Sequence, residues 1–451
     1  MAHDRRAFLR RAGALGASGF ASRLAPLSLL AAHAAPAQAA EDYKALVCVF
    51  LFGGMDGNNV VIPADAGYAS YAATRPESSG INIAQSQLLP LPLSDGSVYG
   101  LHPSLAAIHP LFGQGKLAVL ANVGSLTAPT TRANYGAARP DNLYSHADQQ
   151  GQWQSAVAEG RSATGWGGRI ADAVDTGSAF PVMTSIAGAS LFTLGASTQP
   201  LALSATGGLA LQGFGNNTAG RARLAAFQSI LASASGNAFV EAAAGITSRA
   251  VSLSGLVNPI LTAATSSVTP HFTGQNSSIA QELLQVAKLI EARAQTGARR
   301  QVFFVSLGGF DTHSNELNTL TTLLGQLGPA LKGFYEAMGA LGVADRVTTF
   351  TLSDFGRTFQ PASGGGSDHA WGNHHFILGG AVRGAAMYGR YPVLVPGGPD
   401  DAEAEGRWIP TTSIEQYGAT LARWFGVPEV AIPAIFPNLA RFAPADLGFL
   451  A

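Results

Sequence analysis

Apolar runs of seven or eight residues recur along this chain, and they predict the strands of a buried sheet. Four of them occupy residues 45–52 (ALVCVFLF), 116–123 (KLAVLANV), 301–307 (QVFFVSL) and 346–352 (RVTTFTL). Runs of this length, apolar or β-branched with little polar alternation, are typical of strands buried on both faces. A further run at 376–382 (FILGGAV) predicts one more strand.

Between these runs the apolar residues recur every three or four positions, which predicts helices. Residues 301–352 are predicted to form a strand, a helix and a second strand, which implies that the two strands pair in parallel. We interpret a mainly helical region at about 205–298 as an insertion that either packs on the domain or caps the sheet edge. The predicted helices cover residues 219–234, 277–294, 316–341 and 414–425.

An acidic residue follows three of the predicted strands after a tight turn. Asp56 follows the first strand, Asp311 follows the strand at 301–307, and Asp354 follows the strand at 346–352. Ligands of open α/β sheets bind at the carboxyl ends of the strands, so we expect these acids at one edge. An ordinary Asp-Gly turn is the alternative interpretation of Asp56.

Histidines accompany these acids. His313 lies two residues after Asp311, and the glycine turn 364–366 leads into a segment that holds three more histidines. Imidazole and carboxylate groups are ligands of divalent metals, whereas the alternative interpretation is a solvated polar loop. The predicted ligand set is Asp56, Asp311, His313, Asp354, Asp368, His369 and His374.

Ser145 begins a predicted helix, and two functions are open for it. With Asp148 three residues later, it has the placement of an N-cap. The alternative is a serine nucleophile, for which the helix N-terminus would help to bind an anionic ester. Arg357 is a candidate clamp for charged oxygens, or else a structural ion-pair partner of a carboxylate.

The first 39 residues read as an export signal. Arg5 and Arg6 precede Phe-Leu, a weakly apolar stretch follows from about 12 to 35, and Ala37-Gln38-Ala39 offers a signal-peptidase site. A membrane anchor or an amphipathic helix is the alternative. We therefore expect a twin-arginine signal at 1–39, the twin-arginine translocase as an export partner, and one large domain at 40–451.

The composition of the chain argues against some classes of binding partner. Hydrophobic residues make up 47% of the chain, charged residues 12%, and the formal net charge is −1. No basic surface for nucleic acid is predicted, and no apolar run after the signal is long enough to span a bilayer. The single cysteine, Cys48, lies inside the first predicted strand, so we expect a buried free thiol.

Several motifs together resemble the exported bacterial family known as domain of unknown function 1501. They are FLFGGMDGNN, NLYSHADQQGQW, GGFDTH, SDFGRT, GSDHAWGNHHFILGGAVRG and QYGATLARWFGV, and they extend over nearly all of the mature chain. That family is grouped with the alkaline phosphatase and sulfatase superfamily. The resemblance implies an α/β, doubly wound, mostly parallel sheet sandwiched by helices, with a metal-dependent hydrolase site at the strand ends.

The resemblance also implies roles. Asp56 matches the first-strand acid, Asp311 with His313 the later pair, Asp354 the next acid, and either His369 or His374 the last histidine; Ser145 matches the nucleophile. The chain departs from the superfamily where Asp354 is followed by Phe355 instead of histidine. It also lacks the Cys-x-Pro-x-Arg signature, so a formylglycine sulfatase is not expected.

The expected activity is hydrolysis of a small phosphate or sulfate ester by a periplasmic or extracellular enzyme. One or two divalent ions (Zn, Ca, Mg or Mn) would activate the Ser145 hydroxyl or a water, with Arg357 binding the charged oxygens and with His146 and Asp148 in support. Two alternatives stay open. One is an inactive member that binds metal or a glycan, and the other is a structural or assembly protein of the cell envelope.

Overall fold

The computed structural model describes residues 42–174, 180–209, 213–233, 235–263 and 265–451. The predicted twin-arginine signal at 1–39 therefore lies outside the described residues.

A nine-stranded sheet forms the centre of the described structure. Its strands are β1 (Lys44–Leu51), β5 (Leu117–Gly124), β6 (Met183–Ser185), β7 (Leu201–Ala202), β8 (Arg300–Leu307), β9 (Val347–Ser353), β10 (Asn373–Gly379), β11 (Ala386–Gly389) and β12 (Thr412–Ser413). Their order is β11-β5-β10-β9-β1-β8-β6-β7, and β12 also pairs with β5. β1 is central and pairs in parallel with β8 and β9.

Of the described strands in this sheet, β10 alone runs antiparallel to its neighbours, β5 and β9. The reason is that no helix crosses back between β9 and β10. The segment 354–372 stays at the carboxyl edge of the sheet, so the next strand starts there and runs the opposite way. The prediction of an α/β fold is confirmed: the sheet is mixed, mostly parallel and flanked by helices.

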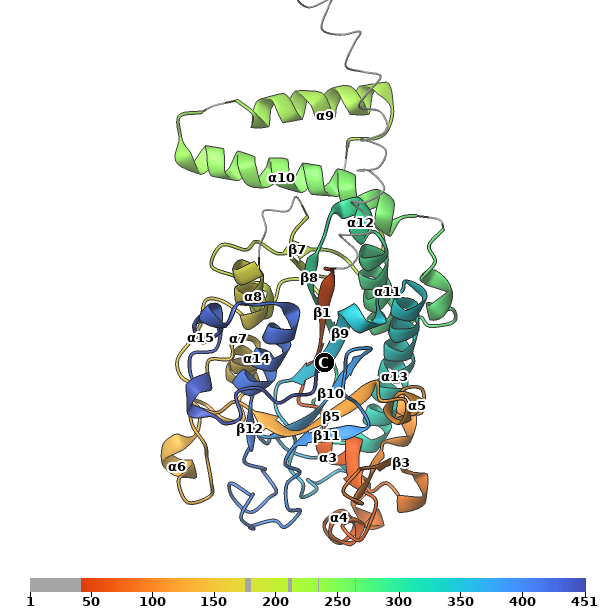
Figure 1. Ribbon diagram of the computed structural model, residues 1–451, viewed down its shortest axis with the longest axis vertical. Helices are drawn as coiled ribbons and strands as arrows, with labels where there is room; N and C mark the ends of the chain where they lie inside the picture. Colours follow the sequence, from red (N-terminus) through yellow and green to blue (C-terminus); the bar gives the residue numbers. More distant parts are fainter. Residues whose placement is uncertain (1–41, 175–179, 210–212, 234, 264) are drawn as a thin grey trace, which may run out of the picture.

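The side chains of β1 alternate between two cores, which explains why its sequence is apolar throughout. Val47 and Val49 face one core, together with α5 (His109–Gly113), α11 (Ser278–Glu291) and α13 (Glu316–Ala340). Cys48 and Phe50 face the other core, together with α7 (His146–Ser155), α8 (Trp166–Val174) and α14 (Ile414–Phe425). Figure 1 shows these two helical layers on either side of the sheet. The Cys48 thiol is free and buried.

Smaller elements complete the carboxyl side of the sheet. The chain leaves β1 through α3 (Gly57–Val60) and enters a three-stranded antiparallel sheet in the order β2-β4-β3. The bounds of these and the remaining short elements are β2 (Val61–Pro63), β3 (Leu89–Pro92), β4 (Val98–Leu101), α4 (Tyr68–Thr74), α6 (Tyr135–Ala138), α12 (Arg293–Thr296) and α15 (Ile432–Ile435).

The region predicted as helical at about 205–298 contains α9 (Thr218–Leu231), α10 (Ala238–Leu261), α11 and α12. α11 packs into the first core, whereas α9 and the start of α10 project from the body, with Phe239 88% exposed. In Figure 1 this arm lies at the end of the molecule near α12, which precedes β8, and α3 lies at the opposite end. The arm therefore does not cap the carboxyl edge of the sheet. No helix in the described part of the chain is long and apolar enough to cross a membrane.

Candidate metal centre

The loops that follow β1, β8 and β9 interlock at the carboxyl edge of the sheet. The Gly53 backbone N–H donates a hydrogen bond to Oδ1 of Asp354 over 3.1 Å. Gly53 has a φ of +115°, and a Cβ at this position would lie 2.4 Å from the backbone nitrogen of Asp311. Only glycine allows this approach, so the first loop holds the two acid-bearing loops together.

The glycine turn brings the next histidine back to the same edge. The segment after β9 pairs with the segment before β10, through bonds from Gly356 N to Trp371 O (3.1 Å) and from Thr358 N to Asp368 O (2.9 Å). A Cβ at Gly366 would lie 2.1 Å from the carbonyl carbon of His313. This packing places Asp368 and His369 beside the loop that carries Asp311 and His313.

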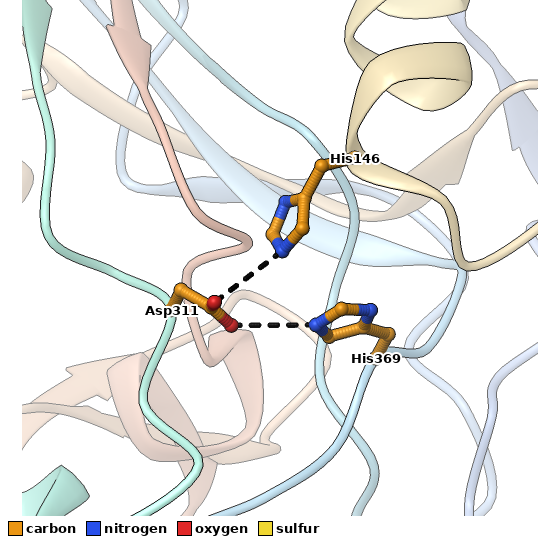
Figure 2. A group of neighbouring side chains, drawn as sticks. All are labelled: His146, Asp311 and His369. Atoms are coloured by element: carbon orange, nitrogen blue, oxygen red, sulfur yellow. Dashed lines mark hydrogen bonds and ion pairs between the residues drawn. The ribbon is translucent and has the colours of Figure 1, made fainter.

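Three imidazoles converge on the carboxylate of Asp311. Nε2 of His313 lies 3.0 Å from Oδ1 of Asp311, and Nε2 of His369 lies 3.3 Å from the same oxygen. Nε2 of His146, the first residue of α7, lies 3.5 Å from Oδ2 of Asp311. Figure 2 shows His146 and His369 pointing toward Asp311 from two different segments. The Nε2 atoms of His313 and His369 are 2.9 Å apart.

Each of the three imidazoles is held through its other nitrogen. Nδ1 of His146 lies 2.7 Å from Oδ2 of Asp354, and Nδ1 of His313 lies 3.0 Å from Oδ1 of Asp368. Nδ1 of His369 lies 2.8 Å from the backbone carbonyl of Tyr144. Because carboxylates and carbonyls only accept hydrogen bonds, each Nδ1 must carry the proton. In the neutral ring, each Nε2 then has a free lone pair, which is the arrangement found in metal-ligating histidines.

The backbone of Tyr144 is held in a conformation that few bulky residues adopt. Its φ is +71°, and its carbonyl accepts from His369. Its backbone nitrogen donates to Oε1 of Gln149 over 2.7 Å, and the Arg407 guanidinium lies 4.5 Å from its ring centroid. Strain of this kind persists where the surroundings impose it, commonly at functional sites.

The donor types and separations of these side chains are compatible with a metal ion. Ligands about 2 Å from a tetrahedral ion lie about 3.3 Å from one another, close to the separations between Asp311 and the three histidines. Nε2 of His146 is buried and has no hydrogen-bond partner, so a cation at the centre would satisfy it. The ligand atoms of His146, Asp311 and His369 all lie within 4.8 Å of one another. His313 adds a third nitrogen.

The charges around Asp311 favour its ionised form. Burial by itself would raise the pKa of Asp311, but the adjacent Arg357 guanidinium outweighs this effect and holds the pKa below its ordinary value. Burial also lowers the pKa of His369, which favours the neutral ligating ring. The Asp311 side chain remains 47% exposed, so the cluster is open to solvent.

Arg357 is a structural cation in this fold. Its side chain is fully buried, and it donates to Oδ1 of Asp311 (3.2 Å), to the Gly53 carbonyl (3.1 Å) and to both the hydroxyl and the carbonyl of Ser367. These protein acceptors occupy its three nitrogens. The alternative of a structural ion pair therefore describes Arg357, and the expected clamp on substrate oxygens does not.

Asp56 has a different position from the one expected of a ligand. It forms an ion pair with Arg75, with Oδ2 and Nη1 2.5 Å apart and both side chains fully buried. Burial favours the neutral acid, but the charge of Arg75 outweighs it and the pKa of Asp56 is lowered. Arg75 also donates to the carbonyls of Thr358 and Phe359, so the pair ties the first loop to the segment after β9.

His374 is likewise engaged elsewhere. It lies inside β10, where its Nδ1 accepts from the Asn122 N–H over 3.0 Å and its ring stacks on Tyr391 at a centroid distance of 4.6 Å. Of the two alternatives for the last histidine, His369 is the one near Asp311. His375, which follows His374 in β10, points to the opposite core and packs against Trp153.

Ser145 caps α7. Its hydroxyl accepts from the Asp148 N–H (3.5 Å) and donates to Oδ2 of Asp148 (2.7 Å). A groove of about 460 Å³ lies along the same helix, lined by polar residues that include Asp141, Asp148 and Arg161. None of the four convergent residues lines this groove.

Three residues of the cluster have roles other than those expected from the sequence. His146 was expected only in a supporting position, although it is one of the convergent imidazoles, whereas Asp354 and Asp368 orient histidines and were expected as ligands. The only local signal for His146 was its place directly after the cap residue Ser145. No signal in the sequence indicated that Arg75 pairs with Asp56.

Comparisons with known proteins identify a family and little more. Two solved structures align over 88% of this chain. One is the crystal structure of Ps i-CgsB (9% identity, 77% of that chain, TM-score 0.36), and the other is its complex with k-i-k-neocarrahexaose (10% identity, 76% of that chain, TM-score 0.34). At these scores the likeness carries no argument about this chain. A search of curated proteins finds no match. Residues 43–397 match a family described as a protein of unknown function, DUF1501, and the chain belongs to this family.

Proposed function

We propose that this protein is an exported, metal-dependent hydrolase of phosphate or sulfate esters, related to the alkaline phosphatase and sulfatase superfamily. The observation that carries the proposal is the convergence of three Nε2 atoms, from His146, His313 and His369, on the carboxylate of Asp311. Each ring is locked by an acceptor at Nδ1, which leaves the lone pairs directed inward.

A cation resolves the electrostatics of this arrangement. With both Nδ1 atoms protonated, the facing Nε2 atoms of His313 and His369 bring two lone pairs within 2.9 Å of each other and beside a carboxylate. A proton on one ring would relieve part of this repulsion, but burial lowers the pKa of His369. A divalent ion would satisfy all four groups together, and three nitrogens with one oxygen are a zinc-type donor set.

The bound ion would supply Lewis acidity toward an ester oxygen. The residues of the chain would hold the ion and orient its ligands. Asp354 fixes the ring of His146, and Gln150 adds a second donor to the same Asp354 oxygen over 2.7 Å. The exposed side of Asp311 would admit the ester group of a small ester or a glycan.

The export proposal rests on the sequence of the first 39 residues. A twin-arginine signal would deliver the folded protein through the twin-arginine translocase to the periplasm or the exterior. This route suits a protein that acquires its metal before export. The net charge of −1 supports a small-molecule substrate and not a nucleic acid.

The test is elemental analysis of protein purified from periplasm, followed by a panel of phosphate and sulfate esters with and without chelator. We expect bound divalent metal and chelator-sensitive hydrolysis of at least one ester. The matched control is the double variant His313→Ala/His369→Ala, which removes two of the candidate metal-ligating imidazoles. Metal without turnover would instead indicate a metal- or glycan-binding envelope protein. Absence of metal together with a stable envelope complex would indicate an assembly protein.

A further inference from the structure

We infer that the centre holds a single divalent ion of the zinc type, because Phe355 presents no ligand atom beside the histidines and Arg357 places a fixed positive charge against Asp311. This inference rests on the proposed metal centre and goes beyond it, since the sequence leaves open one or two ions of four kinds.

Phe355 forms an apolar wall under two of the histidines. Its ring centroid lies 4.7 Å from that of His146 and 4.7 Å from that of His369, and the side chain is fully buried. On its other side, a Cβ at Gly54 would come within 2.4 Å of this ring, so the phenyl group fits tightly against the first loop. A phenyl ring has no ligand atom, and the tight packing leaves no room beside it.

The buried carboxylates near the centre already have hydrogen-bond or ion-pair partners. Oδ1 of Asp354 accepts from Gly53 N, and its Oδ2 accepts from His146 and Gln150. Asp368 accepts from His313, and Asp56 is paired with Arg75. Glu316 accepts from Thr312 and Ser367 inside the core. At Asp354, Asp56 or Glu316 a second ion would have to displace a buried hydrogen bond or ion pair. At Asp368, which is exposed and bonds to His313 through Oδ1 alone, it would find a single carboxylate oxygen.

Arg357 supplies a fixed positive charge on the far side of Asp311. Its Nη1 lies 3.2 Å from Oδ1 of Asp311, and the whole side chain is buried. The guanidinium is always charged and cannot leave, so it repels a second cation from the same carboxylate.

The donor set also selects the class of ion. Three imidazoles and one carboxylate suit zinc and other late divalent transition metals, whereas Ca²⁺ and Mg²⁺ prefer sites built from six or more oxygens. A cobalt-substituted protein should accordingly show the strong visible absorption of a four-coordinate site.

The experiment is a titration of chelator-stripped protein with Zn²⁺, Co²⁺ and Ca²⁺, with the number of ions per chain measured by elemental analysis and calorimetry. We expect one Zn²⁺ or Co²⁺ per chain, with Ca²⁺ unable to compete. Asp354→Asn should still bind one ion, with about 10–100-fold weaker affinity, because it orients His146 and ligates nothing.

The possible outcomes separate this inference from the proposed function. Two ions in the wild type and one in Asp354→Asn would overturn the single-ion inference and make Asp354 a ligand, while the hydrolase proposal would stand. A preference for Ca²⁺ would overturn the zinc-type assignment alone. Failure of the folded wild type to bind any of the three ions would overturn both proposals.

Discussion

Oδ2 of Asp354 lies 2.7 Å from Nδ1 of His146, although the two residues are 208 positions apart in the sequence. Asp354 follows β9, whereas His146 begins α7. The carboxylate is buried and the imidazole is partly exposed, so Asp354 acts as a rigid support that turns Nε2 of His146 toward Asp311. A carboxylate–histidine pair of this kind raises the basicity of a metal ligand.

Removing one convergent histidine should lower both metal content and thermal stability. We expect His369→Ala to lose bound metal and to show a smaller drop in Tm on chelation than the wild type, because a bound ion stabilises only the folded state. His271→Ala is the control, since this histidine belongs to a turn at 269–272, outside the cluster. Full metal content in His369→Ala would contradict the site.

Ser145→Ala should behave as the loss of a helix cap. The Ser145 hydroxyl bonds to both the N–H and the carboxylate of Asp148, so its removal should cost about 1 kcal/mol of unfolding free energy. Urea unfolding measures this cost, and metal content and ester hydrolysis should persist. Loss of hydrolysis with metal retained would instead make Ser145 the nucleophile.

Asp56→Asn should destabilise the fold without changing the metal content of the folded protein. The substitution leaves Arg75 as an unpaired buried cation, which costs about 3–5 kcal/mol. The double variant Asp56→Asn/Arg75→Met should recover much of this loss in urea unfolding. If Asp56→Asn kept its stability and lost metal, Asp56 would be a ligand after all.

Glu282 should make the protein less stable as pH rises from about 4.5 to about 7. Burial raises the pKa of Glu282 from about 4.5 to about 7, although the Ser306 N–H partly opposes this. The folded state then binds a proton that the unfolded chain has already released, so stability is full below pH 4.5 and falls until about pH 7.

Glu282→Gln isolates this effect from other buried acids. The variant keeps an acceptor for Ser306 and has no charge, so its stability relative to the wild type should increase by up to about 3 kcal/mol across the same pH window. Urea unfolding at pH 4.5 and pH 8 measures the difference. Parallel pH profiles for the two proteins would show that Glu282 titrates normally.

Replacing Arg5 and Arg6 with lysine should leave an unprocessed precursor in the cytoplasm. In the unaltered chain we expect cleavage after Ala39, so that the mature protein begins at Ala40. Cell fractionation and N-terminal sequencing check both expectations. Efficient secretion of the double-lysine variant would count against the twin-arginine route.

The apolar runs were sufficient to predict the long strands β1, β5, β8 and β9 and the edge at which polar residues gather, but not the short strands β6, β7, β11 and β12. Asp311, His313 and Asp354 directly follow buried strands, and parallel strands end at one side of a sheet, so local pattern alone brings them together. The glycine turn at 364–366 likewise indicated that the chain folds back, as it does beside His313.

Tertiary packing decided which of these side chains face one another. Local pattern specifies burial, but it does not specify which partner a buried charge finds. Asp56 therefore pairs with Arg75, and His374 turns to Asn122, in contacts that only the packed loops create. His146 reaches Asp311 because α7 packs against the end of β9, and no spacing in the sequence records the distance between a helix start and a loop more than a hundred residues later.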